Sequence, residues 1–259
     1  MTTVLLDEVA RRLDALLRTS EIPDYPQAVN GVQVENRSPI RRIAVAVDCS
    51  RKTIDAAIES GANLLVVHHG LFWGGLQPIR GPFYERLYRL LTHDVAIYSS
   101  HLPLDAHPTV GNNILLAHEL GLEPSAPFGR FQNTYIGAQG ECDVATAELV
   151  AHADRFAQIH GGRAMTSAAT KDRRTRRWAV CTGAGASAET LRDAAASGID
   201  TLIVGEGPHW TAVDAPELGI VIIYAGHYAT ETLGVQAIGG WLAREFGLPW
   251  SFVEAPTGL

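Results

Sequence analysis

An internal repeat is the feature that most restricts how this chain can fold. Residues 53–67 (TIDAAIESGANLLVV) align without a gap with residues 190–204 (TLRDAAASGIDTLIV), and residues 95–101 (VAIYSSH) align with residues 221–227 (VIIYAGH). In each copy a helix-like segment precedes a short aliphatic run, which is typical of strand–helix–strand units with parallel strands. The repeat predicts two similar α/β domains from an internal duplication, each with a mostly parallel or mixed sheet flanked by helices.

We expect the first α/β domain to comprise residues 1–124 together with residues 222–259. The second α/β domain would comprise residues 125–221, because the pattern changes there to a long strand-like segment, a helix and another strand-like segment at residues 163–168. No low-complexity stretch separates the two.

Composition limits the classes of function. The chain has 259 residues, of which 46% are hydrophobic and 19% charged, and its net charge is −7. A nucleic-acid partner is therefore disfavoured, because it would require clustered Lys and Arg. The basic run at residues 171–177 is interpreted as a solvated loop or strand end. The chain has no signal-like start and no apolar stretch of membrane-spanning length, so we expect no membrane association and a cytoplasmic location.

The three cysteines show no metal-binding or redox spacing. Cys49, Cys142 and Cys181 lie in apolar contexts without a CxxC motif. They are predicted to be buried free thiols in a reducing compartment.

Two adjacent histidines follow the aliphatic run of the first copy. His68 and His69 come directly after residues 64–67 (LLVV). In open α/β sheets, ligands collect at the carboxyl ends of the strands, and neutral imidazole is a common metal ligand. The alternative is that one histidine caps the strand while the other is solvated.

A histidine followed four residues later by a carboxylate occurs in both copies. The pairs are His101 with Asp105 and His227 with Glu231. Residues i and i+4 share one face of a helical turn, and Glu231 is predicted to open the last long helix. Pro103 interrupts the first pair, which is therefore predicted to lie on a loop. Each pair alone is also compatible with a structural hydrogen bond or a helix cap.

Together these side chains predict a metal site. Imidazoles and carboxylates at several strand ends suit two divalent ions a few ångströms apart. No cysteine lies near them in sequence, so the nitrogen and oxygen donors favour Zn, Fe(II) or Mn.

Several stretches resemble a known family when they are taken in combination. They are residues 30–34 (NGVQV), 66–73 (VVHHGLFW), 101–107 (HLPLDAH), 111–113 (GNN) and 226–231 (GHYATE). The chain resembles the Nif-three-like family of dinuclear-metal hexameric proteins, the GTP cyclohydrolase 1 type 2 homologues. It is most similar to the short bacterial members, because it has no room for the domain inserted in longer ones.

The resemblance implies roles for individual residues. The metal ligands that it implies are His68, His69, Asp105, His227 and Glu231. It places His101 close to the metals without making it a ligand, so His101 would orient a carboxylate or move a proton. Residues 205–209 (GEGPH) match a loop that faces the metal cavity, where Glu206 and His209 would contact the ligands or the substrate.

The resemblance also implies an activity and an assembly. The expected function is that of a dinuclear divalent-metal hydrolase acting on a nucleotide-like small molecule through a metal-activated water, with His101 and Glu206 as catalytic residues. The alternative is a non-enzymatic metal-binding scaffold, metal-insertion or regulatory protein. The family forms a toroidal homohexamer. The turn at residues 183–185 (GAG) before a predicted helix is a possible anion site or only a turn, and basic residues near the ligand motifs are few, namely Arg80 and Arg86.

Overall fold

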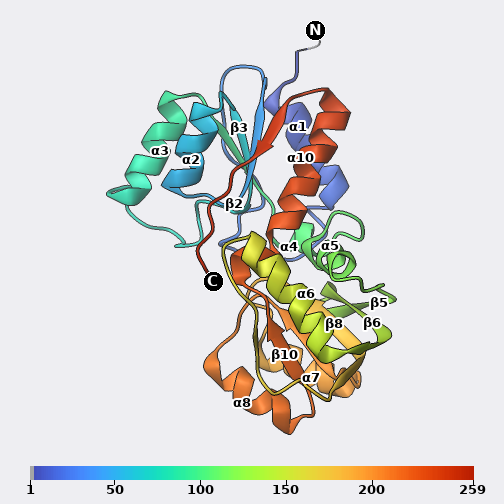
Figure 1. The fold of residues 1–259 in the computed structure, drawn as a ribbon. Coiled ribbons are helices and arrows are strands. Elements are labelled where there is room, and N and C mark those ends of the chain that lie inside the picture. The colour runs from blue at the N-terminus through green and yellow to red at the C-terminus, as the bar shows by residue number, and fades with distance from the viewer. Residues whose placement is uncertain (1–2) are drawn as a thin grey trace. The chain divides into compact units, whose positions relative to one another are not determined.

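Two separate β-sheets organise the chain, each in its own unit (Figure 1). The computed structural model describes residues 3–259. Unit 1 consists of the residues up to Leu104 together with Gly234–Ala255. Unit 2 consists of Asp105–Leu233 together with Pro256–Leu259. The chain thus crosses from one unit to the other within helix α4 (Leu102–Asp105), within helix α10 (Thr232–Phe246) and again near its end.

The sheet of unit 1 has five strands in the order β1-β4-β3-β2-β11. Strands β11, β2, β3 and β4 are parallel, and β1 pairs with β4 in the antiparallel sense. The strand bounds are β1 Gly31–Val34, β2 Ile43–Asp48, β3 Leu64–His69, β4 Ala96–Ser99 and β11 Trp250–Phe252.

Helices cover both faces of this sheet, as Figure 1 shows. Apolar side chains of β2 and β3 pack with helices α2 (Arg51–Glu59) and α3 (Pro82–Thr92) in one buried cluster. Alternate residues point the other way, towards α1 (Leu6–Leu17) and α10, and Tyr98 of β4 donates a hydrogen bond of 2.8 Å to Asp14 of α1. Because both faces are buried, the strands read as continuous aliphatic runs in the sequence.

The sheet of unit 2 has six strands in the order β5-β6-β8-β9-β10-β7. Strands β8, β9 and β10 are parallel, whereas the outer strands pair in the antiparallel sense. The strand bounds are β5 Ala126–Phe131, β6 Thr134–Ala145, β7 Met165–Thr166, β8 Arg174–Cys181, β9 Thr201–Val204 and β10 Val221–Tyr224.

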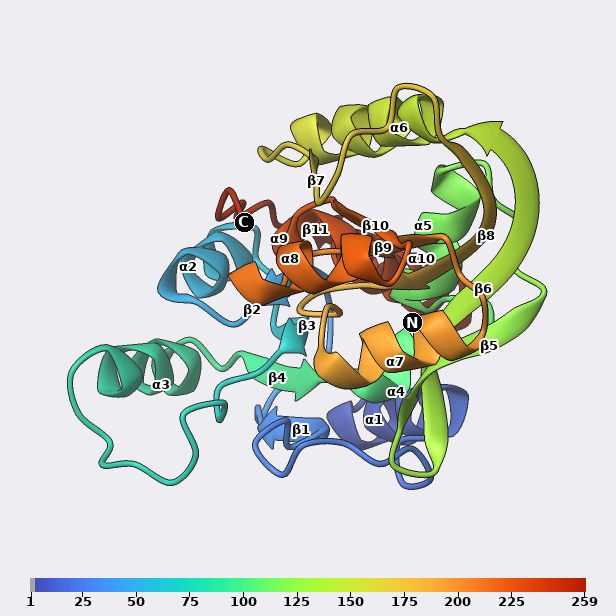
Figure 2. The same cartoon turned by 90° about the horizontal axis from the view of Figure 1, so that it is seen from below.

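Unit 2 also has helices on both faces of its sheet. Helices α5 (Asn112–Glu119) and α6 (Thr146–Ile159) pack on one face around the fully buried Trp178. Helices α7 (Ala188–Ala196) and α8 (His209–Glu217) pack on the other face. Figure 2 shows α6 and α7 on opposite sides of β8 and β9. The short helix α9 (His227–Thr230) follows β10. These two layered units confirm the predicted α/β fold class.

The duplication is visible in matching details of the two units. Ser50 caps α2 by accepting a hydrogen bond of 3.2 Å from the Thr53 amide, and Ser187 caps α7 by accepting one of 3.1 Å from the Thr190 amide. Each cap contributes about 1 kcal/mol to helix stability. The aligned residues Gly61 and Gly198 both end their helices with positive φ, at 77° and 66°.

The unit boundaries differ from those expected from the sequence. The expected division put residues 105–124, 222–233 and 256–259 with the first sheet, whereas all three segments belong to unit 2. Helix α5 shares the buried cluster of Trp178, and β10 pairs with β9 along its whole length. Packing thus assigns the first two segments to unit 2, although the repeat in the sequence does not mark where one hydrophobic core ends.

Other local expectations can be checked directly. The cysteines are free, as predicted; Cys49 and Cys181 are buried as expected, whereas Cys142 is only partly buried. The expected strand at residues 163–168 is reduced to β7, which has two residues. Among the helices formed by residues 3–259, none combines the length and the apolar character needed to cross a membrane.

Candidate functional site

Three imidazoles gather at the carboxyl ends of β3 and β4 in unit 1. His68 and His69 end β3, and His101 follows β4, so the parallel pairing of the two strands brings them to one edge. One ring nitrogen from each lies within 4.8 Å of one from the others. His68 is fully buried, and His69 and His101 are half-buried. The expectation that the two adjacent histidines lie at a strand end is confirmed.

Each of these imidazoles is oriented through its Nδ1 atom by an oxygen acceptor. The three pairs, each at 2.9 Å, are His68 with the Ser100 carbonyl, His69 with the Asp48 carboxylate and His101 with the Asp24 carboxylate. When Nδ1 donates its proton in such a bond, Nε2 carries the lone pair that can bind a metal. This is the arrangement found around metal-ligating histidines.

Asp24 and Asp48 are the residues of this cluster that the sequence analysis missed. Asp48 precedes α2 and is easily taken for its cap, but Ser50 is the cap and the Asp48 side chain instead binds His69. Asp24 lies between two prolines, far from His101 in sequence. The only signal for it is a carboxylate beside a proline-rich turn, which is too common to single out.

Asp24 is held as an ionised group. Burial raises the pKa of its carboxyl, but hydrogen bonds from His101, from the Asn30 amide and from the Leu102 backbone outweigh burial and leave the pKa below its usual value. The Asn30 and Leu102 bonds measure 2.8 and 2.9 Å. The Asp24 side chain is only 6% exposed. A fixed negative charge therefore faces the Nδ1 side of His101.

Aromatic side chains cover the imidazoles. The Trp73 ring meets His101 edge-on at 4.7 Å between centroids and His69 at 5.8 Å. Tyr25 contacts both Trp73 and His101. Trp73 comes from the loop after β3, so this loop places an aromatic ring against both imidazoles.

A second cluster lies in unit 2 and is built on α9. His227 begins this helix, and Glu231 is the residue that ends it, four positions later. The Glu231 carboxylate lies 3.2 Å from Nε2 of His227, and Glu206 accepts a hydrogen bond of 2.8 Å from its Nδ1. The expected i, i+4 pairing is present, but α9 provides it, because the long helix α10 begins only at Thr232.

The two carboxylates act strongly on the His227 imidazole. Burial lowers its pKa, but the hydrogen bonds and charges of Glu231 and Glu206 outweigh burial and raise the pKa to about 9. Glu231 is 2% exposed. In the absence of another cation, this pocket of negative charge therefore retains a proton on His227 at neutral pH.

Asp105 is the third predicted ligand in unit 2. It is buried, and the Asn112 amide donates a hydrogen bond of 2.8 Å to its carboxylate. Asn113 anchors the same turn, since its amide oxygen accepts a hydrogen bond of 2.8 Å from the Thr182 backbone. The prediction of a loop around Pro103 is wrong, because residues 102–105 form the helix α4. Proline is tolerated in a first helical turn, where its missing N–H would have no partner.

The thiol of Cys181 lies near these carboxylates. Burial, together with the charges of Asp105 and Glu231, raises its pKa to about 12. Cys181 thus remains a neutral thiol and is a poor metal ligand.

Glycines give the unit 2 cluster its space. A Cβ at Gly183 would collide with the Glu231 carboxylate. A Cβ at Gly205 would lie 2.8 Å from Cα of His227 and 2.5 Å from the Gly183 carbonyl oxygen. Gly205 is the residue that aligns with His68, so close packing of His227 explains why the second copy has no side chain there. The proximity of Glu231 also makes the turn at Gly183 unfavourable for the anion considered above.

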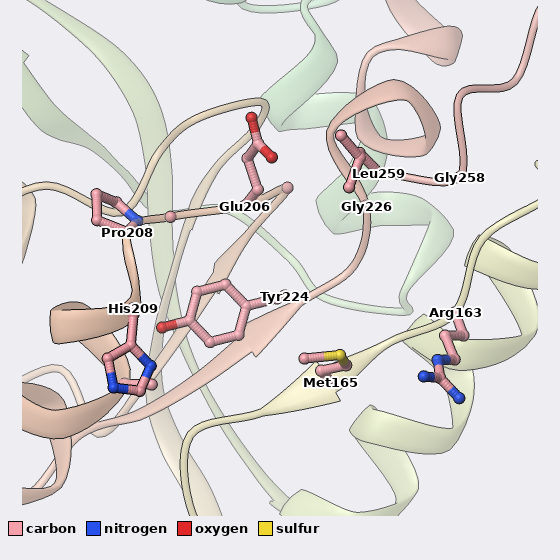
Figure 3. A pocket seen from close by; sticks show the side chains of 12 residues that line it. Arg163, Met165, Glu206, Pro208, His209, Tyr224, Gly226, Gly258 and Leu259 are labelled. Atoms are coloured by element: carbon pink, nitrogen blue, oxygen red, sulfur yellow. The ribbon is translucent and has the colours of Figure 1, made fainter.

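A pocket of about 260 Å³ adjoins this cluster on unit 2 (Figure 3). Glu206 belongs both to its lining and to the hydrogen bond with His227. His209, at the start of α8, is exposed and lines the same pocket. Other side chains that line the pocket are those of Arg163, Met165, Pro208, Ala212 and Tyr224.

The predicted site residues thus fall into two sets. His68, His69 and His101 form one in unit 1. Asp105, His227, Glu231 and Glu206 belong to unit 2.

The chain is similar to known proteins over nearly its whole length. Residues 4–257 match the family model described as Duf34/NIF3 (NGG1p interacting factor 3). A GTP cyclohydrolase 1 type 2 homolog of Deinococcus radiodurans is 43% identical over 253 residues, with 98% of this chain and 94% of the relative covered. One from Pyrococcus horikoshii is 41% identical, with 98% and 99% covered. The solved structure of the protein ybgI superposes with a TM-score of 0.89 at 33% identity, covering 99% of this chain and 100% of that one.

Proposed function

The chain belongs to the Duf34/NIF3 family, and from this premise we propose that it is a metal-dependent hydrolase that holds two divalent ions and acts on a nucleotide-like small molecule. The proposed ligands are His68, His69, Asp105, His227 and Glu231. The relatives are named as homologs of GTP cyclohydrolase 1 type 2, so support for the activity comes from the residues of this chain.

The observation that carries the proposal is the orientation of the imidazoles. Nδ1 of His68, His69 and His227 each meets an oxygen acceptor at 2.8–2.9 Å, which leaves Nε2 as the metal-binding atom. All three histidines lie at or just after the carboxyl ends of parallel strands, where α/β sheets collect ligands. With Asp105 and Glu231 as oxygen donors, the set fits Zn, Fe(II) or Mn and contains no thiolate.

Bound divalent ions would polarise the substrate and supply a water acidic enough to react near neutral pH. The remaining chemistry belongs to the side chains. Asp24 holds His101 through Nδ1, so Nε2 of His101 is placed to accept or deliver a proton. Glu206 fixes the ring of His227 in the same way. Trp73 shields His101 from bulk water, which strengthens each of these electrostatic contacts.

Metal content of purified variants tests the proposal. Asp105→Asn should lose metal measured by inductively coupled plasma mass spectrometry, because it removes the anionic donor with little change of shape. Asp172→Asn is the matched control, since Asp172 is exposed in a loop. If Asp105→Asn retains full metal content, Asp105 is not a ligand and the proposed centre is wrong.

A non-enzymatic metal-binding scaffold or metal-insertion protein is the second candidate. It is favoured by the scarcity of cations beside the imidazoles, because a triphosphate substrate normally meets several Lys or Arg side chains. Arg86 of unit 1 donates a hydrogen bond to the Cys49 carbonyl and so is engaged elsewhere. His101→Gln separates the candidates in a turnover assay against nucleotides and phosphoesters. The hydrolase should keep its metal and lose turnover, whereas a scaffold shows no turnover to lose.

The cytoplasmic location and the toroidal homohexamer remain parts of the proposal. Light scattering coupled to gel filtration measures the assembly directly. A mass six times that of the chain is expected, and a monomer would contradict it.

A further inference from the structure

We propose that the pocket beside Glu206 is the substrate-recognition site, and that it takes a planar nitrogen heterocycle with ring N–H donors and a single anionic substituent. This inference rests on the proposed function, because only a reaction at the His227 cluster gives the pocket a substrate. The link is Glu206, which lines the pocket and accepts the 2.8 Å hydrogen bond from His227.

The walls of the pocket select a flat ligand. Tyr224 presents its ring to the pocket, and its hydroxyl is tied to Thr211 at 2.7 Å, which fixes the ring. Met165 and Pro208 add apolar surface, and Met adapts well to an aromatic partner. Much of the remaining lining is glycine backbone, which is flat and lets a ring approach closely.

The volume limits the size of the ligand. At about 260 Å³ the pocket lies just below the range of roughly 300–1,000 Å³ that holds drug-sized ligands. A bicyclic ring with one small substituent is the appropriate scale. A nucleoside triphosphate would extend well outside it.

Opposite charges mark separate parts of the lining, as Figure 3 shows for Glu206 and Arg163. The Glu206 side chain is 43% exposed, so its carboxylate can accept hydrogen bonds from ring N–H groups as well as from His227. Arg163 forms no ion pair with any carboxylate among residues 3–259 and is exposed towards solvent. As the one Lys or Arg in the lining, it matches one carboxylate or phosphate group.

Three fluorescent probes separate these contributions in an anisotropy titration. Pterin-6-carboxylate has both the ring N–H donors and the anion, pterin lacks the anion, and 2-naphthoate lacks the donors. Wild-type protein should bind pterin-6-carboxylate tightest, and Arg163→Gln should weaken it about tenfold to the level of pterin, as expected for one charge-assisted hydrogen bond.

Two further variants complete the test. Ala212→Phe fills the pocket and should abolish binding of all three probes, with thermal unfolding used to check its folding. Arg155→Gln is the matched control, because Arg155 is exposed on α6 away from the pocket, and it should bind like wild type. Lack of binding by wild type, or binding unchanged in both Arg163→Gln and a folded Ala212→Phe, overturns the inference.

Metal content measured on the same samples keeps the two proposals apart. Arg163→Gln should hold as much metal as wild type. Protein that holds metal but does not bind pterin-6-carboxylate refutes the inference alone. Protein that binds the probe in the pocket but holds no metal refutes the proposed function alone.

Discussion

Replacing Gly205 by alanine tests the packing argument for the asymmetry of the two repeats. The new Cβ would lie 2.5 Å from the Gly183 carbonyl oxygen and 2.8 Å from both Cα of His227 and the Thr230 hydroxyl. Real Cβ atoms do not approach so closely, and two of these three neighbours are backbone atoms that cannot rotate away. Gly205 is buried, and its Cβ would point at these three atoms, so the added methyl group has no free space to occupy.

The expected cost is that of overpacking, about 1–3 kcal/mol. For a chain of this size each 1 kcal/mol lowers Tm by roughly 2–4 °C, so the metal-free variant should unfold between about 2 and 12 °C below wild type. Differential scanning calorimetry at one pH measures this shift. The displaced backbone of His227 should also weaken metal binding, which titration calorimetry detects.

Gly162→Ala is the matched control for that experiment. A Cβ at Gly162 meets only the Ala157 carbonyl oxygen at 3.6 Å, which is an ordinary contact. The Tm of Gly162→Ala should therefore stay close to that of wild type. If Gly205→Ala is as stable as Gly162→Ala and binds metal normally, the space around His227 is not the reason for the glycine.

Four further predictions concern charge and capping. Because folding lowers the pKa of Asp24, its charge stabilises the native state above about pH 4. This contribution is lost as the pH falls through the lowered pKa. Asp24→Asn should therefore flatten the acid limb of a plot of unfolding free energy against pH. Metal binding at pH 7.5 should release about one proton from His227, because its pKa is raised to about 9 in the metal-free protein. Calorimetry in two buffers of different ionisation enthalpy counts the protons released. No release would contradict the assigned charge state of His227. Because folding raises the pKa of His227, its charge stabilises the metal-free protein fully below pH 6.5, and this contribution is lost as the pH rises through about 9. Ser50→Ala and Ser187→Ala each remove a helix cap, so each should lower the unfolding free energy by about 1 kcal/mol in urea titrations. Clearly unequal losses would argue against the equivalence of the two caps.

The sequence predicted the repeated α/β architecture because strand and helix periodicities survive in both copies. The aliphatic runs before His68 and before Gly205 are buried parallel strands, and the predicted i, i+4 contact of His227 with Glu231 is present. Such features depend on local pattern, which a single sequence displays.

Features that depend on tertiary packing could not be predicted in the same way. Asp24 reaches His101 across a long stretch of chain, and no local pattern relates the two residues. Helix α5 joins the core of unit 2 because of the apolar surface around Trp178, which the repeat does not reveal. The helix at Pro103 was missed because proline was interpreted as a break rather than as a first-turn residue.

X-ray absorption spectroscopy of the zinc-loaded protein tests the central claim most directly, because it reports the atoms bound to the metal. We predict a shell of nitrogen and oxygen at about 2.0–2.2 Å with outer-shell scattering from imidazole. Asp105→Asn should reduce the zinc content and the oxygen part of that shell. A sulfur shell near about 2.3 Å, or a spectrum without imidazole scattering, would contradict the proposed ligands.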